Sequence, residues 1–361
     1  MREETPPGKP LPLHVPDTLE EAMSPDWLNA ALGQRFPTIQ ITSVALGPIV
    51  SRVSTNARFR ITCEPDVPPG LPDHLCIKGY FADLSEWAIL SRTAGEPEAF
   101  FYRELAELSG VRTLRSFYAD VDPTTHHGVV ISDDVVHQGA SFLDALSDFT
   151  PDQAAQSLEQ YAVLHGRTWG REQLADPRLS PRVEATLRAR GLPEIKGNFD
   201  GPIGVGVPSE IRDAERLVNA VRLLQNLLTS AEPRCLLHGD AHIGNLYLDA
   251  AGRPCLVDWQ LVQRGPWYLD VGYHLACAIG VEDRRRTERD LLAHYLEHLG
   301  AEGGEVPTWD EAWRLVRVGM VYGFFLWAIT LKVAPQITAA MLERLGTAVA
   351  DHDAYSVTEK I

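Results

Sequence analysis

The sequence has 361 residues, of which 45% are hydrophobic, and this is enough to bury the cores of about two domains. Its net charge of -16 argues against nucleic acid as a partner, because binding to a phosphate backbone depends on clustered Lys and Arg side chains. Five scattered cysteines, a polar N-terminus without a signal segment and the absence of a long apolar run predict a cytoplasmic protein with no membrane partner, whose oligomeric state stays unknown.

The first part of the chain predicts a small antiparallel sheet with one helix before it. Residues 1–17 are Pro-rich and charged, and we expect them to be flexible. A helix is predicted over residues 18–34, because Thr18 and Glu21 have capping-box spacing and apolar residues then recur at helical intervals. Short alternating stretches predict the strands 41–50, 57–64, 75–79, 114–121 and 129–132.

A polar turn, residues 51–56, joins the first two strands. Thr55, Asn56 and the backbone N–H groups of this turn could cradle a phosphate group, although an ordinary polar hairpin turn would contain the same residue types.

Lys78 is placed in the middle of an apolar strand and is the only Lys between Lys9 and Lys196. A lysine there is costly to bury unless a carboxylate pairs with it. The helix predicted over residues 95–105 offers two candidates, Glu98 and Glu104, and spacing alone leaves both open.

The periodicity becomes helical after residue 141. Residues 151–169 follow a capping box, and further helices are predicted over 210–228, 308–331 and 339–350. His165 lies on the apolar face of the first of these helices, which is typical of a hydrogen-bonded core histidine. Residues 176–206 are rich in Pro, Gly and Arg and predict short helices mixed with loops.

Residues 237–260 contain the side chains that carry the predicted chemistry. Two short apolar strands, 246–248 and 255–257, flank a Gly- and Pro-containing turn, and this hairpin would bring Asn245 and Asp258 together at its open end. Asp240 precedes Asn245 by five residues, as in a kinase catalytic loop. Phosphoryl transfer requires a carboxylate that orients the acceptor hydroxyl and oxygen ligands that hold Mg²⁺.

The motifs His-Gly-Asp-x-His-x-x-Asn at 238–245 and Asp-Trp-Gln at 258–260 resemble those of the aminoglycoside phosphotransferase and choline kinase family of small-molecule kinases. Leu-His-Gly-Arg-Thr-Trp at 164–169 resembles a signature of its ecdysteroid-kinase-like branch. The resemblance implies an α+β, bilobal protein-kinase-like fold. A nucleotide-binding lobe with a small antiparallel sheet would span residues 18–134, and a larger, mostly helical catalytic and substrate lobe would span residues 135–361.

The same resemblance implies ATP- and Mg²⁺-dependent phosphorylation of a hydroxyl group on a small molecule, such as an antibiotic or another hydroxylated metabolite. It assigns Asp240 as the catalytic base or orienting group, places His242 beside the transferred phosphate, and makes Asn245 and Asp258 the Mg²⁺ ligands. Lys78, paired with Glu98 or Glu104, would contact the α- and β-phosphates, and the backbone of Asp133 and Val135 would contact the adenine. His238 and Asp270 would give structural support.

Other functions remain open at this point. His238, Asp240 and His242 form a His-x-Asp-x-His pattern that could bind zinc in a hydrolase. A non-catalytic nucleotide-binding module is a second alternative, but the complete set of Asp240, Asn245 and Asp258 argues against it. Aromatic residues at 322–327, together with Trp267, would favour a neutral alcohol over a polycationic aminoglycoside if their faces line the acceptor site.

Overall fold

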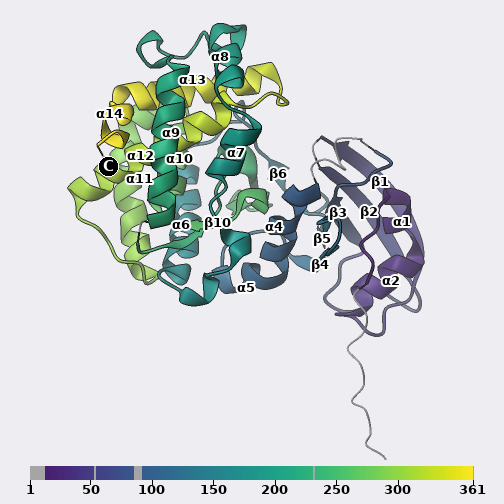
Figure 1. Ribbon diagram of the computed structural model, residues 1–361. Helices are drawn as coiled ribbons and strands as arrows, with labels where there is room; N and C mark the ends of the chain where they lie inside the picture. Colours follow the sequence, from purple (N-terminus) through teal and green to yellow (C-terminus); the bar gives the residue numbers. More distant parts are fainter. Residues whose placement is uncertain (1–12, 53, 85–91, 231, 361) are drawn as a thin grey trace, which may run out of the picture. The chain divides into compact units, whose positions relative to one another are not determined.

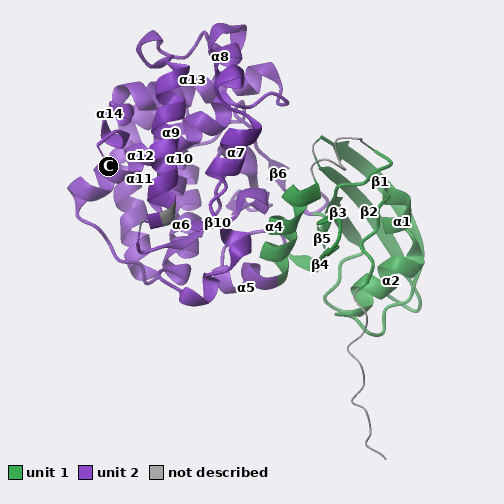
Figure 2. Ribbon diagram, in the orientation of Figure 1, with its two compact units in different colours: residues 1–103, 115–134 green, residues 104–114, 135–361 purple. Residues whose placement is uncertain are grey.

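The computed structural model describes residues 13–52, 54–84, 92–230 and 232–360. The chain divides into two compact units, coloured separately in Figure 2. Unit 1 consists of Met1–Arg103 and Arg115–Asp134, and unit 2 consists of Glu104–Leu114 and Val135–Ile361. The sequence prediction had assigned all of residues 18–134 to the first lobe. Residues 104–114 instead belong to unit 2, where Arg112 N–H donates to Gln160 and the Arg112 guanidinium donates to the Pro254 carbonyl.

Unit 1 is built on a five-stranded antiparallel sheet with the order β1-β2-β3-β5-β4, and the five strands predicted from the sequence are present (Figure 1). Its elements are α1 (Leu19–Ala22), α2 (Pro25–Gly33), β1 (Ile41–Ser51), β2 (Thr55–Cys63), β3 (His74–Gly79), α4 (Gly95–Phe100), β4 (Ser116–Val121) and β5 (Gly128–Asp133). A π-helical turn, Phe101–Leu105, follows α4 where the sequence predicted continuous helix.

The two faces of the sheet have different partners. Leu75 and Ile77 on β3 are buried in one core cluster with Trp27 and Leu28 of α2. Because successive side chains of a strand point to opposite faces, Lys78 lies on the other face. This second face is where α4 packs on β4 and β5.

The N-terminal segment differs from its prediction in two ways. The expected helix 18–34 is interrupted, because the Ser24 hydroxyl accepts the Trp27 N–H and Pro25 begins a second helix. Residues 13–17, predicted to be flexible, are ordered against unit 1, with Val15 only 2% exposed in the core. Residues 1–12 of that prediction lie outside the described part.

Unit 2 is mostly helical and contains two small sheets, one with the order β6-β8-β9 and one pairing β10 with β7. Its elements are α5 (Ala106–Ser109), β6 (Ser141–Phe142), α6 (Pro151–Thr168), α7 (Val183–Ala189), α8 (Leu192–Asp200), α9 (Ala214–Ser230), β7 (Cys235–Leu237), β8 (Leu246–Leu248), β9 (Pro254–Leu256), β10 (Gln263–Gly265), α10 (Tyr268–Cys277), α11 (Val281–Ala301), α12 (Trp309–Ala328), α13 (Pro335–Asp351) and α14 (Ala354–Thr358).

Two of these helices, α10 and α12, approach each other closely at a pair of glycines. A Cβ atom on Gly272 would collide with the Val316 carbonyl oxygen, and one on Gly319 would collide with the Tyr268 carbonyl oxygen. This close approach fixes the position of α10, whose side chains reach the candidate site described below.

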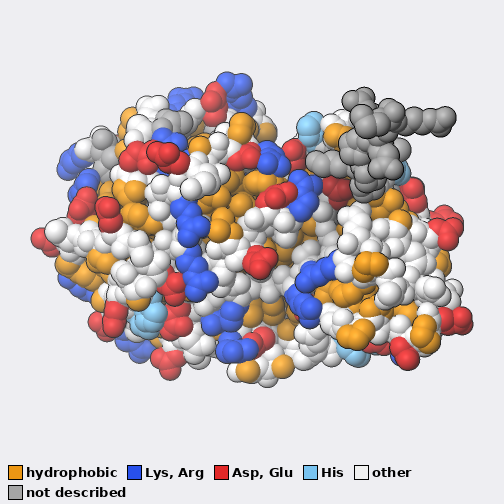
Figure 3. All heavy atoms as spheres, turned by 90° about the horizontal axis from the view of Figure 1, so that it is seen from below, with side chains coloured by type: hydrophobic (Ala, Val, Ile, Leu, Met, Phe, Trp, Pro, Cys, Tyr) orange, Lys and Arg blue, Asp and Glu red, His pale blue; other side chains and the backbone are white. Residues whose placement is uncertain are grey.

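Three features of the surface and the side chains bear on the expectations from composition. Figure 3 shows Lys and Arg side chains with Asp and Glu side chains beside them on the same face. All five cysteines are free. Among the residues that the structure describes, no helix is long and apolar enough to cross a membrane.

A buried histidine in unit 1 predicts a pH-dependent stability. His127 is fully buried, its Nε2 accepts the Tyr80 N–H at 2.7 Å, and burial lowers the pKa of its imidazole from 6.5 to about 4. Between about pH 6.5 and 4, His127 is therefore protonated in the unfolded chain and neutral in the folded chain. We expect its contribution to stability to be complete above pH 6.5 and to be lost as the pH falls toward 4, by up to about 1.4 kcal/mol per pH unit.

Urea unfolding between pH 7 and 4 tests this expectation. The variant His127→Gln should show a shallower fall of the unfolding free energy than the parent, because glutamine can accept the Tyr80 N–H without titrating. The exposed neighbour His126 pairs with Glu96, a contact that would stabilise the fold at low pH, so the control variant His126→Gln should not make the fall shallower. Equal slopes in parent and His127→Gln would contradict the assignment.

Candidate active site

The site in unit 2 is organised by the predicted hairpin. Strands β8 and β9 pair in register from Leu246–Leu256 to Leu248–Pro254, and Val257 N–H donates to the Asn245 carbonyl oxygen at 2.9 Å. Asn245 and Asp258 therefore flank the same end of the hairpin. Asp258 has a left-handed backbone, with φ of 67°, which is uncommon for a residue with a side chain and frequent at functional sites.

The Asp240 carboxylate is held from three sides. Its Oδ1 atom accepts from the Tyr273 hydroxyl at 3.1 Å, and its Oδ2 atom accepts from Asn245 Nδ2 at 3.2 Å and lies 3.4 Å from His242 Nε2. Its side chain is 27% exposed. The carboxylate is thus fixed in orientation while it keeps access to solvent.

Burial raises the pKa of Asp240. The His242 imidazole, together with His238 and the Tyr273 hydroxyl, lowers the pKa by more than burial raises it, so the net result is a pKa below the ordinary value of 3.8. Asp240 is therefore ionised at neutral pH. An anion is the form that can accept a hydrogen bond from an acceptor hydroxyl.

His242 is oriented by the backbone of its own turn. Its Nδ1 atom accepts the Gly244 N–H at 3.0 Å, which leaves Nε2 as the nitrogen that faces Asp240. The imidazole and the Trp327 ring pack in a T-shaped arrangement with their centroids 5.1 Å apart. The structure thus gives His242 a contact with Asp240, whereas its predicted contact with the transferred phosphate stays a prediction.

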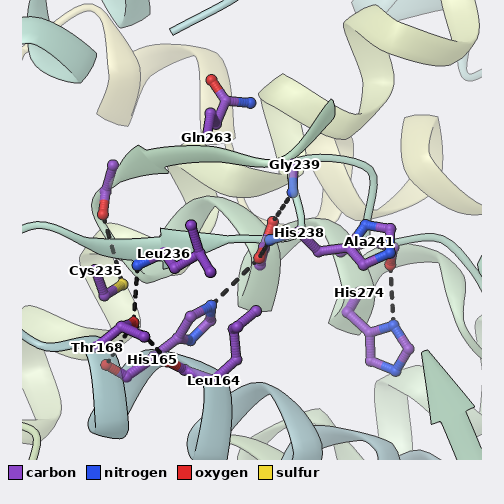
Figure 4. Close-up of polar contacts among 12 residues, drawn as sticks. Leu164, His165, Thr168, Cys235, Leu236, His238, Gly239, Ala241, Gln263 and His274 are labelled. Atoms are coloured by element: carbon purple, nitrogen blue, oxygen red, sulfur yellow. Dashed lines mark hydrogen bonds and ion pairs between the residues drawn. The ribbon is translucent and has the colours of Figure 1, made fainter. Parts of the chain in front are cut away.

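Asp270 supports the backbone of the loop that leads to Asp240. It is completely buried on α10, and its carboxylate accepts the backbone N–H groups of His238 at 2.6 Å and Gly239 at 2.9 Å. His165 on α6, labelled in Figure 4, donates to the same carboxylate at 3.2 Å, so the prediction of a hydrogen-bonded core histidine is confirmed. Gly239 has φ of 82°, and a Cβ atom there would collide with the Leu261 carbonyl oxygen.

Both ring nitrogens of His238 form hydrogen bonds with the backbone. Nε2 donates to the Val257 carbonyl oxygen at 2.8 Å, and Nδ1 accepts the Asp240 N–H at 3.3 Å. The side chain is 0% exposed, and burial lowers its pKa. Neither nitrogen is free to bind a metal, so a zinc site on His238, Asp240 and His242 does not fit this structure.

Three further residues have contacts around the loop that the sequence analysis did not predict. Tyr273 holds Asp240, and His274 Nδ1 donates to the Ala241 carbonyl oxygen at 2.9 Å (Figure 4). The Tyr322 hydroxyl donates to the Gly239 carbonyl oxygen at 2.7 Å. All three lie within apolar helical stretches and have no sequence signal of their own, apart from the i, i+3 and i+4 spacing of Tyr273 and His274 from Asp270.

The aromatic residues proposed as an acceptor surface are buried instead. Phe324 and Phe325 are 0% exposed, Tyr322 is 2% exposed, and Trp327 and Trp267 are each 5% exposed. Phe324 stacks on Phe199, and Trp267 stacks on Tyr295. The preference for a neutral alcohol that was inferred from their faces is therefore not supported.

The donor set at Asn245 and Asp258 suits Mg²⁺. Asn245 Nδ2 donates to the Asp240 carbonyl oxygen at 2.9 Å as well as to its carboxylate, so the amide oxygen points away from Asp240. That oxygen and the Asp258 carboxylate are hard oxygen ligands of the kind that Mg²⁺ prefers.

In unit 1, Lys78 Nζ lies 2.6 Å from Glu98 Oε2, with the side chains 15% and 5% exposed. This contact answers the question that spacing left open between Glu98 and Glu104. Asn56 is the direct cross-strand partner of Lys78, so both side chains share one face of the sheet. Thr55 pairs with Gly79, is 1% exposed and lies on the opposite face. The structure therefore does not bring Thr55 to Lys78, and Val53 of the same turn lies outside the described residues.

The two residues whose backbone is predicted to contact adenine, Asp133 and Val135, have partners within their own units. Asp133 N–H donates to the Arg115 carbonyl oxygen at 3.2 Å, and the Asp133 carboxylate accepts the Arg115 N–H at 3.2 Å. The Val135 carbonyl oxygen accepts the Ala140 N–H at 2.9 Å. These bonds fix the backbone at both residues, and adenine recognition there stays a prediction.

Comparisons with known proteins place this arrangement in a family. A model of the phosphotransferase enzyme family matches residues 97–312, which is more than half of the chain and includes Glu98, Asp240, Asn245, Asp258 and Asp270. No curated protein matches the chain in sequence.

Several solved structures resemble the chain over most of its length. An ethanolamine kinase from Plasmodium vivax is 10% identical, with 89% of this chain and 86% of that chain covered and a TM-score of 0.53. A choline kinase from Streptococcus pneumoniae is 12% identical, with 92% and 100% covered and a TM-score of 0.49. A spectinomycin phosphotransferase in complex with ADP and spectinomycin is 12% identical, with 93% and 98% covered and a TM-score of 0.48.

At these identities the likeness shows the fold alone, and it is the protein-kinase-like α+β fold that the sequence predicted. The family match extends over the catalytic loop and the hairpin that the geometry singled out. The chain therefore belongs to the phosphotransferase enzyme family.

Proposed function

We propose that the protein transfers the γ-phosphoryl group of ATP to a hydroxyl group of a small molecule. The observation that carries this proposal is the Asp240 carboxylate, which is ionised, partly exposed and fixed between Tyr273, His242 and Asn245. A carboxylate held in this way can receive the hydroxyl hydrogen of an acceptor and aim the oxygen in line with the phosphoryl group.

The lowered pKa of Asp240 bears on whether it would act as a general base or as an orienting group. A carboxylate with a pKa below 3.8 is a weak base toward a ground-state alcohol. Its main contribution is therefore orientation of the nucleophile. The hydroxyl proton passes to Asp240 late, when bond formation to phosphorus has made the hydroxyl acidic, as the loose transition state of phosphoryl transfer allows.

Asn245 and Asp258 would hold Mg²⁺ through the amide oxygen and the carboxylate. A bound Mg²⁺ supplies charge neutralisation on the β- and γ-phosphates. Since Asn245 also donates to Asp240, one side chain links the metal ligands to the residue that orients the acceptor.

Lys78 would contact the α- and β-phosphates. Its pairing with Glu98 at 2.6 Å holds the ammonium group in one position on a face of the sheet that also presents Asn56. This is the arrangement of the Lys–Glu ion pair in kinases.

Two alternatives are weaker. A zinc hydrolase would need His238 as a ligand, yet both of its nitrogens are used by the backbone. A non-catalytic nucleotide-binding module would have no need for the Tyr273 and His242 contacts that orient Asp240.

The direct test is a screen for phosphoryl acceptors. Purified protein with ATP and Mg²⁺ is incubated with a panel of hydroxylated antibiotics and metabolites, and ADP release and acceptor mass are measured. We expect at least one compound to gain 80 mass units, the increment of one phosphoryl group, which is about the mass of HPO₃. Release of phosphate without any modified acceptor, across a broad panel, would argue for a different reaction.

Asp240→Asn should separate chemistry from nucleotide binding. We expect phosphoryl transfer to the acceptor found in the screen to fall by about 10³-fold, while the Kd for ATP changes less than about threefold, because the carboxylate acts on the hydroxyl. Steady-state kinetics and calorimetry measure the two quantities. Asp249→Asn, at the far turn of the same hairpin, is the matched control and should retain activity. Comparable loss in both variants would indicate damage to the hairpin.

Asp258→Asn should remove the advantage that Mg²⁺ gives to nucleotide binding. In the parent, ATP should bind more tightly with Mg²⁺ than with EDTA. In the variant we expect the Kd with Mg²⁺ to rise about tenfold or more and the Kd in EDTA to stay the same, because only the metal contact is lost. An unchanged Mg²⁺ dependence would show that Asp258 is not a metal ligand.

A further inference from the structure

A second cluster of metal-competent side chains lies on unit 2, between α6 and α11. His294 and His298 are one helical turn apart on α11, and Glu159 is on the neighbouring helix α6. One ligand atom from each of these three residues lies within 4.8 Å of the other two. In the part of the chain that the structure describes, this is the one group of three His, Cys, Asp or Glu residues with that spacing.

The two histidines converge on one carboxylate oxygen. Glu159 Oε1 lies 3.1 Å from His294 Nε2 and 4.0 Å from His298 Nε2, and the two imidazole centroids are 4.2 Å apart. Ligands bound to one zinc ion at about 2.0–2.1 Å in a tetrahedron lie about 3.4 Å from each other. Side-chain rotations that close the cluster by about an ångström are therefore sufficient.

The tautomer of His298 is already the one that a metal requires. Its Nδ1 donates to the His294 carbonyl oxygen at 2.8 Å, so in the neutral imidazole the lone pair is on Nε2, the atom that faces Glu159. A backbone carbonyl that accepts from the distal nitrogen is a common partner of metal-binding histidines, because it fixes the ring and raises its basicity.

The two helices that carry the cluster are also joined by contacts further toward their C-terminal ends. Further along the pair, His165 of α6 lies 2.8 Å from the Tyr295 hydroxyl of α11, and Arg167 pairs with Glu302 at 2.9 Å. Gly166 allows Glu302 to approach so closely that a Cβ atom on this glycine would be 2.6 Å from that of Glu302. The three candidate ligands therefore sit on a rigid frame.

We propose that Glu159, His294 and His298 bind a divalent late first-row transition metal, with Zn²⁺ as the best match, and that the ion ties α6 to α11. Two imidazole nitrogens and one carboxylate oxygen form a ligand set that Zn²⁺ favours, and water would occupy the fourth position because the side chains are about one-third exposed. To bind the metal through Nε2, the His294 imidazole must be neutral with its one proton on Nδ1. A neutral ring that carries its proton on Nε2, facing Glu159, therefore moves that proton to Nδ1 by exchange with water, and a protonated ring releases one proton to solvent.

This site differs from the proposed Mg²⁺ site in its chemistry and its position in the chain. Asn245 and Asp258 offer oxygen ligands only, whereas the α6–α11 cluster is rich in nitrogen. A plain ion pair would account for Glu159 and His294, but it requires neither the second imidazole nor its backbone-fixed tautomer.

The test uses untagged full-length protein freed of metal with EDTA. Competition with a zinc-binding dye measures Zn²⁺ affinity, and Co²⁺ absorption in the visible range reports the coordination geometry. We expect one Zn²⁺ per chain, a tetrahedral Co²⁺ spectrum and a melting temperature that rises with added Zn²⁺. His298→Gln and Glu159→Gln should each weaken binding by about 100-fold or more and abolish the Co²⁺ spectrum.

Two control variants isolate the cluster. His126 also pairs with a glutamate, Glu96 at 2.9 Å, so His126→Gln removes a comparable imidazole from unit 1 and should leave Zn²⁺ affinity unchanged. His242→Gln removes the histidine of the catalytic loop and should likewise leave it unchanged. Equal affinity in the parent and His298→Gln, loss of binding in His242→Gln instead, or no Zn²⁺ binding by the parent would each overturn the proposal. Circular dichroism of the metal-free variants checks that each one folds.

Discussion

The hydrogen bonds of the buried Asp270 carboxylate are the interactions on which the loop before Asp240 depends. A carboxylate without partners would be very costly to bury, and the Asp270 carboxylate avoids this cost by accepting hydrogen bonds from two backbone N–H groups and from His165 Nε2. Those N–H groups belong to His238 and Gly239, the two residues that directly precede Asp240. The hydrogen bonds that allow Asp270 to be buried are therefore the same ones that fix the backbone leading to Asp240.

One helix supplies most of this support. Asp270, Tyr273 and His274 follow the i, i+3, i+4 spacing of α10, so they share the face that is turned to the loop. The first binds the backbone before Asp240, the second binds its carboxylate and the third binds the Ala241 carbonyl after it. The glycine contacts between α10 and α12 hold this helix in place, which explains why small residues are found at Gly272 and Gly319 in the middle of long helices.

The sequence predicted the parts of the fold that local patterns encode. Lys78 stood out as a charge in an apolar strand, and a helix with two glutamates followed it, but selecting Glu98 required the three-dimensional packing of α4 on the sheet. Thr55 and Asn56 looked equivalent in the sequence. The register of β2 against β3 separates them, since neighbouring residues of a strand point to opposite faces. Tyr273, His274 and Tyr322 could not be distinguished from ordinary core residues, because the groups they bind are backbone or side-chain atoms far away in the sequence.

The charge environment of Asp240 depends on which nitrogens of the two neighbouring histidines already have hydrogen-bond partners. His238 uses both nitrogens on the backbone, and His242 uses one on its own turn, so one imidazole nitrogen, His242 Nε2, remains to face the carboxylate. This neighbour keeps Asp240 ionised, but the same attraction makes it a weaker base. In the function proposed here, such a site would gain its rate from holding the acceptor and the phosphates in line, because positioning and charge neutralisation account for nearly all of the catalysis in phosphoryl transfer.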